Sequence, residues 1–171
     1  MISAVPKLLF GEEGGPKPVG SIAFTVPAVP VAQPRPRATL APGGESARMH
    51  EVTHIKNANT GDRKAHPIVA FKATVRLTAQ GIFKGAPLEG PLRLNVLFVM
   101  PRPGNMIWQR RPMPRALHEK RPDLDNLAKS TKDALTGILW RDDSQIAILN
   151  ARKVIAAGDE QPCVEVQVMQ L

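Results

Sequence analysis

The 171-residue sequence predicts an α+β domain in which helices cover one face of a small mixed β-sheet. Two segments carry apolar residues at helical spacing, and several shorter segments show the period-two alternation of strands. The two kinds of segment are interspersed along the chain. Because 43% of the residues are hydrophobic, the chain can bury one core. We therefore expect a single domain over residues 21–171, after a flexible Gly- and Pro-rich extension over residues 1–20.

The first half of the domain begins with a β-prone run, "SIAFTV", which Pro27 and Pro30 end. Residues 31–64 have no stable period and predict a long loop. Residues 66–83 predict a helix with Pro67 in its first turn. The helical spacing is carried by Ile68, Phe71, Val75 and Thr78.

The second half opens with a half-buried strand over residues 92–100, where every second residue from Leu92 to Met100 is apolar and Arg93 and Asn95 lie on the opposite side. An exposed, strongly basic loop follows. From residue 124 a second helix is predicted, with an apolar stripe and a glycine at its end. The stripe comprises Leu127, Ala128, Thr131, Leu135 and Ile138, with Gly137 at the end. Two final strands, in residues 144–157 and 162–171, are expected to form a hairpin through the turn "GDEQ".

The net charge of +8 and the pI near 10.2 favour a polyanionic partner such as nucleic acid. Cys163 is the sole cysteine, which excludes an intrachain disulfide and a cysteine zinc cluster. No apolar run is long enough to span a bilayer, and the opening residues do not resemble a signal peptide. We expect a cytoplasmic protein without membrane contact.

Acidic residues gather at both ends of the second predicted helix. Asp123 and Asp125 flank its start, Lys129 follows one turn later, and Asp142 and Asp143 come after its end. Each part has a plain explanation: a helix cap, an i,i+4 ion pair and a polar turn. Together they also match the carboxylate donors that Mg²⁺ prefers, with a lysine to stabilise charge on phosphate.

The stretch "KRPDLDNLAKSTKDALTGILWRDDSQI" resembles the signature of the RusA-like Holliday junction resolvases, small endonucleases of phages and prophages. The segment "FTVPAVPVAQPRPR" is similar to the opening strand and Arg-Pro-Arg element of that family. The likeness extends over roughly residues 21–170 and is patchy over 38–90.

The resemblance implies a RusA-like homodimer whose two active sites nick opposing strands of a four-way junction during DNA recombination and repair. It implies Mg²⁺ as cofactor, with Mn²⁺ as a substitute. Asp123, Asp125 and Asp143 match the metal-binding catalytic acids of the family and Lys129 its catalytic lysine, while Asp142 is a possible alternative ligand. A family position read as structural corresponds to Asp133.

Basic residues in two loops are candidates for binding branched DNA through its phosphates. They are Arg35, Arg37, Arg110, Arg111, Arg115, Lys120 and Arg121. Trp108 is expected to anchor its loop, and Trp140 to lie in the core. Three alternatives stay open at this point: a non-catalytic nucleic-acid-binding module whose acids merely cap a helix, an accessory factor with an acidic protein partner, and an inactive prophage copy of the resolvase.

Overall fold

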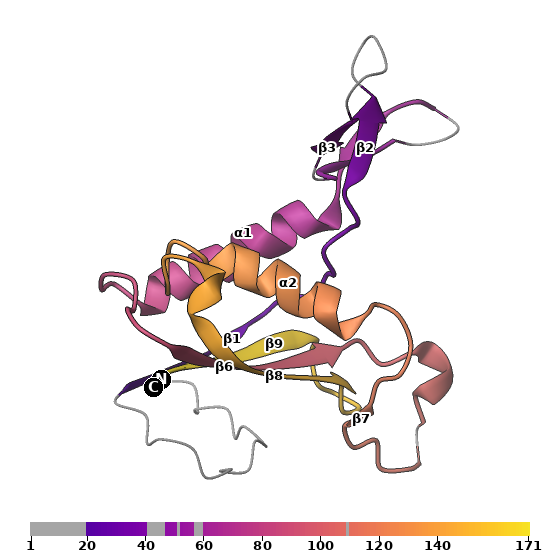
Figure 1. Cartoon of the computed structure of the whole chain (residues 1–171). Helices are drawn as coiled ribbons and strands as arrows, with labels where there is room; N and C mark the ends of the chain where they lie inside the picture. The colour runs from indigo at the N-terminus through magenta and orange to yellow at the C-terminus, as the bar shows by residue number, and fades with distance from the viewer. Residues whose placement is uncertain (1–19, 41–46, 51, 57–59, 109) are drawn as a thin grey trace.

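The computed structural model describes residues 20–40, 47–50, 52–56, 60–108 and 110–171. Within them, one five-stranded mixed sheet carries two helices on one face (Figure 1). This arrangement confirms the predicted α+β class.

Residues 1–19 of the expected N-terminal extension lie outside the described residues, and Gly20 already belongs to the first strand. In the described ranges no helix is both long and apolar enough to cross a membrane.

The sheet has the strand order β1-β9-β6-β8-β7, and only β6 and β8 run parallel. Its strands are β1 (Gly20–Val26), β6 (Leu92–Met100), β7 (Ala116–Leu117), β8 (Ile146–Ile155) and β9 (Cys163–Gln170). A parallel pair requires a crossover connection, which here contains the second helix. The short strand β7 lies within the basic loop and was not predicted.

The expected hairpin between the last two strands is wrong, because β6 lies between β8 and β9. The chain leaves β8, crosses the end of β6 where the Ala156 N–H donates to the Met100 carbonyl at 2.8 Å, and returns along the other side of β6. A local turn signal marks where the chain reverses, and it does not reveal which strand becomes the neighbour.

Both predicted helices are present as α1 (Pro67–Ile82) and α2 (Leu124–Leu135). In α1 the His66 side chain accepts a hydrogen bond from the Ile68 N–H at 3.1 Å and so caps the helix. Beyond the end of α2, Gly137 adopts a φ of 79°, which a glycine tolerates without strain.

The main core lies between the helices and one face of the sheet. The predicted stripe of α2 is buried, and so is Trp140, whose indole N–H donates to the Thr136 hydroxyl at 3.1 Å. The opposite side of β6 was expected to face solvent, yet Asn95, Leu97 and Val99 are also buried there. That part of the half-buried interpretation is wrong.

The segment expected to be a long loop contains two short antiparallel hairpins instead. One pairs β2 (Arg37–Leu40) with β3 (Ala47–His50), and the other pairs β4 (His54–Lys56) with β5 (Arg63–Ala65). They stand away from the sheet beyond the start of α1 (Figure 1). We call residues 34–65 the arm.

Candidate active site at the start of helix α2

The carboxylate of Asp123 does not cap a helix, although its position favours capping. Asp123 is the N-cap residue of α2, but its side chain makes no capping hydrogen bond. Asp125 lies in the first turn, and both residues are exposed. The explanation of Asp123 as a helix cap therefore fails, and its oxygens remain available to a ligand.

The second plain explanation, an ion pair between Asp125 and Lys129, does not hold either. No ion pair or hydrogen bond links them to each other or to any other described side chain, although their i,i+4 spacing puts them on one helix face. Asp125 and Lys129 are therefore exposed and unpaired on one face of α2, two residues after the uncapped start of the helix at Asp123.

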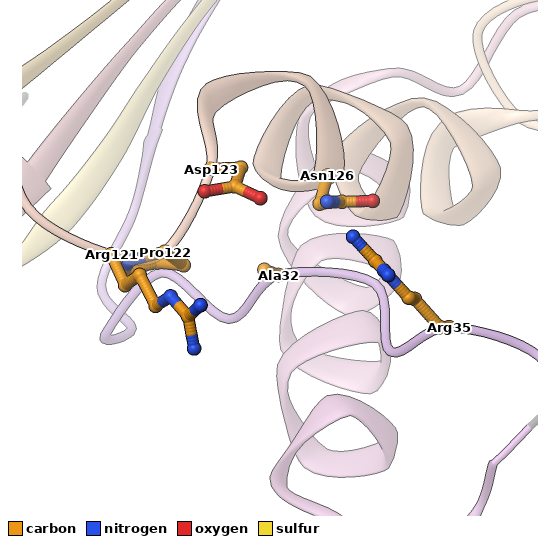
Figure 2. A pocket seen from close by; sticks show the side chains of 6 residues that line it. All are labelled: Ala32, Arg35, Arg121, Pro122, Asp123 and Asn126. Carbon is orange, nitrogen blue, oxygen red and sulfur yellow. The ribbon is translucent and has the colours of Figure 1, made fainter.

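An open pocket lies against this end of α2. Asp123 and Asn126 reach into it from the helix, and Arg35 and Arg121 flank it on either side (Figure 2). Ala32 and Pro122 complete the lining. Two guanidinium groups beside the uncapped Asp123 carboxylate suit an anionic ligand that approaches together with a cation.

The chain after β1 is fastened to α2, which brings Arg35 to the pocket. The Gln33 N–H donates to the Asn126 carbonyl at 2.9 Å, and the buried Ser130 hydroxyl donates to the Val31 carbonyl at 2.7 Å. These two bonds explain how residues remote in sequence meet at one end of one helix.

Lys153 holds the turn that leads into Asp123. It projects from β8, and its ammonium donates to the Lys120 and Pro122 carbonyls, each at 2.6 Å. The same ammonium and burial lower the pKa of His118, with burial the larger cause. Lys153 therefore fixes the backbone just before the first of the two aspartates.

The two acids after α2 have different surroundings. Asp142 accepts a hydrogen bond from the Ser144 N–H at 2.9 Å. The Ser144 side chain, and after it the Ser144 N–H, lower the pKa of the Asp142 carboxyl. The Gln145 side chain accepts from the Asp142 N–H in return, completing a capping box on the short helix that follows. Asp142 thus serves the local turn.

Asp143 instead pairs with Lys132 on α2 at 3.1 Å. Lys132 comes two helical turns after Asp125, about 10 Å along the helix axis. Asp143 therefore lies beside the same exposed face of α2 as Asp125 and Lys129, farther along the helix. Among the described residues, no three His, Cys, Asp or Glu side chains are close enough together to hold a metal ion as a group.

The residues present nevertheless fit Mg²⁺ in donor chemistry. This ion is usually bound by one or two carboxylates, with water and substrate phosphate as its other ligands. Asp123 and Asp125 supply two carboxylates without hydrogen-bond donors. They are the residues that would hold a divalent cation here.

The basic loop contains residues of two kinds. Arg102 is turned inward and donates to four backbone carbonyls. Arg115 is paired with Glu160 and Glu165, which raise its pKa, the hydrogen bond to Glu160 most of all. Because its charge is balanced inside the fold, Arg115 does not fit the expected phosphate contact.

The other candidate DNA-binding residues of this loop are exposed. They are Arg110, Arg111, Lys120 and Arg121. Trp108 is also exposed, and its N–H lies 3.2 Å from the Met113 sulfur. The side chain of Arg37 lies outside the described residues. Asp133 pairs with Lys72 of α1 at 3.4 Å, as a structural residue would.

Sequence reasoning missed Asn126, Lys132 and Lys153. Asn126 directly follows the aspartate pair, but nothing in its type indicated a pocket. Lys153 did leave a signal, because it lies on the same face of its strand as Ala151 and Ile155, which are partly buried and buried. A lysine at such a position needs acceptors, which predicts carbonyls nearby.

Comparison with known proteins agrees with this geometry. The family model "Endodeoxyribonuclease RusA" matches residues 27–169. The chain belongs to the RusA endodeoxyribonuclease family.

Two relatives of this RusA-family chain show how far its similarity to individual proteins extends. The "Crossover junction endodeoxyribonuclease rusA" of Lactococcus phage r1t is 35% identical over 82 residues, which cover 47% of this chain and 56% of the phage protein. The "Uncharacterized protein YqaN" of Bacillus subtilis (strain 168) is 30% identical over 157 residues, which cover 88% of this chain and 96% of that protein. The family and the phage relative support a nuclease.

Proposed function

We propose that this protein is a structure-selective endodeoxyribonuclease that resolves four-way DNA junctions by paired nicks in opposing strands. The supporting observation is the carboxylate of Asp123, which has no capping hydrogen bond and lines one pocket with two arginines, together with the unpaired Asp125 in the next turn of α2. The phage relative carries the corresponding name. Recombination and repair are the processes that require such an activity.

Each residue has a role in this proposal. Arg35 and Arg121 hold phosphates on either side of the scissile bond. Asp123 and Asp125 orient the attacking water, and Lys129, one turn further on, stabilises the negative charge that develops on phosphate. Asp143 is the proposed third acid, in preference to Asp142, whose carboxylate caps the turn.

A divalent cation, Mg²⁺ or Mn²⁺, bound at these acids would supply charge neutralisation and a more acidic water. The exposed Arg110, Arg111 and Lys120 bind the flanking duplex, and we leave Arg115 out of this surface because it is already paired with two acids. Two opposed strands require two sites, so we propose a homodimer. We expect it to act in the cytoplasm, where its DNA lies.

The test replaces single acids with their amides. Asp125→Asn should reduce the single-turnover rate on a synthetic four-way junction by at least about a hundredfold, the usual lower range for removal of an acid–base group. Junction binding, measured by fluorescence anisotropy in EDTA, should stay within about twofold, because the arginines and lysines remain.

Asp142→Asn is the matched control. Asp142 is next to Asp143 and carries the same charge, but its carboxylate caps the local turn. It should retain most of the cleavage rate. Full cutting by both Asp125→Asn and Asp143→Asn would remove the catalytic assignment. An inactive wild-type protein that still binds junctions would favour the non-catalytic alternative.

A further inference from the structure

The hairpin β4–β5 in the arm has a charge arrangement that folding alone does not explain. Lys56 and Arg63 are direct cross-strand partners. Side chains of such partners project to the same face with their β-carbons about 5 Å apart, and like charges placed there destabilise the pair. Neither side chain has an ion-pair partner in the described ranges.

This hairpin also contributes nothing to the core. All residues of both three-residue strands are exposed. Isolated two-stranded hairpins are marginally stable in water. A short hairpin that concentrates repulsive charge on one face is stabilised when an anion binds across that face.

The arm is nevertheless attached firmly to the body at both ends. At its exit the His66 N–H donates to the Thr53 carbonyl at 2.8 Å, and His66 then caps α1. At its entrance the chain has just been fastened to α2, and Arg35 at the base of the arm lines the pocket with Asp123. The segment thus carries Arg35 at the pocket and, farther along the chain, Lys56 and Arg63 on the hairpin.

We propose that the face of β4–β5 carrying Lys56 and Arg63 binds the phosphates of a duplex DNA arm that leads away from the pocket. The inference rests on the proposed function, because the pocket defines where the DNA begins. Two cations at cross-strand spacing can bind neighbouring phosphates of one strand. The ligand is duplex DNA, which runs past both the pocket and the hairpin.

The test compares two double variants that each remove two positive charges. Lys56→Ala/Arg63→Ala removes the proposed contacts. The control, Lys64→Ala/Lys84→Ala, removes one charge from the opposite face of the same hairpin, where Lys64 is the partner of Ile55, and one from the chain after α1. Binding to a four-way junction is measured in EDTA over a range of salt concentrations, so the result does not depend on cleavage.

For Lys56→Ala/Arg63→Ala we expect the slope of log affinity against log salt to become shallower by about 1.8, which corresponds to two phosphate contacts. At 0.1 M salt the affinity for a long-armed junction should fall by roughly tenfold to a hundredfold. On a junction whose arms are cut back to a few base pairs, the variant should match the wild type. The charge-retaining Lys56→Arg/Arg63→Lys should bind like the wild type.

Equal losses in the two double variants would overturn the proposal, because the effect would then follow net charge alone. An unchanged salt slope, or an equal loss on the short-armed junction, would overturn it as well. These outcomes concern binding only. Failure of the proposal for the β4–β5 hairpin is therefore distinguishable from failure of the nuclease assignment, which the Asp125→Asn cleavage rate tests.

Discussion

Asp123 occupies the N-cap position, where an aspartate side chain normally accepts a hydrogen bond from the first turn of the helix. The Asp123 side chain makes no such bond. A good N-cap contributes about 1 kcal/mol, so an uncapped start to α2 has a measurable cost. Residues that break a local rule in this way are typical of functional sites. The adjacent Asp125 and Lys129, also without partners, extend the same argument along the helix.

The ion pair between Lys132 and Asp143 leads to a prediction about cation affinity. The Lys132 ammonium competes with a cation for the Asp143 carboxylate, so Lys132→Met should lower the half-saturating Mg²⁺ concentration for cleavage. An exposed ion pair is worth at most about 1 kcal/mol, which limits the change to about fivefold. The measurement is the junction cleavage rate across a Mg²⁺ titration at constant ionic strength.

Lys72→Met is the control, because Lys72 pairs with Asp133 on the helix–helix contact away from the pocket residues. It should leave the Mg²⁺ dependence unchanged. A higher Mg²⁺ requirement in Lys132→Met would contradict this account of Asp143.

At the scale of the elements, the turn before α2 depends on a residue from a different strand. Lys153 of β8 donates hydrogen bonds to two carbonyls of that turn. In Lys153→Met the partly buried Pro122 carbonyl loses its donor, which should reduce the free energy of unfolding by about 1–3 kcal/mol. Because the turn positions Asp123, the cleavage rate at saturating protein should fall more than junction affinity does.

Urea unfolding and single-turnover cleavage measure the two effects, with the exposed Lys84→Met as control. Loss of stability with an unchanged rate at saturation would mean that Lys153 supports the fold without positioning the site.

Elements with a clear local pattern of apolar residues were predicted correctly from the sequence. Helical spacing identified α1 and α2, and alternation identified β6. Pairing between distant segments was not accessible, so β8 and β9 were wrongly joined as a hairpin and the β4–β5 pair was missed. Three-residue strands without buried residues leave no periodic signal.

At the scale of the whole molecule, the sequence indicated candidate acids but not their arrangement. Asp123 and Asp125 are two residues apart, so no tertiary contact is needed to bring them to the same end of the helix. The position of Asp143 depends on the course of the chain after α2, and the pocket depends on residues 31–35 meeting that helix. Composition likewise gave the net charge of +8, while only the fold separates Arg115, paired internally, from Arg35 and Arg121 at the pocket.

The central claim is that the start of α2 forms a divalent-cation-dependent site for cutting branched DNA. The most direct measurement titrates Mg²⁺ at fixed ionic strength with the wild-type protein, a four-way junction and a linear duplex of matching sequence, and maps the products on a denaturing gel. The account predicts no cutting in EDTA, Mg²⁺-dependent paired nicks in opposing strands of the junction, and an intact duplex. Cutting in EDTA at the same rate, or equal cutting of the linear duplex, would contradict it.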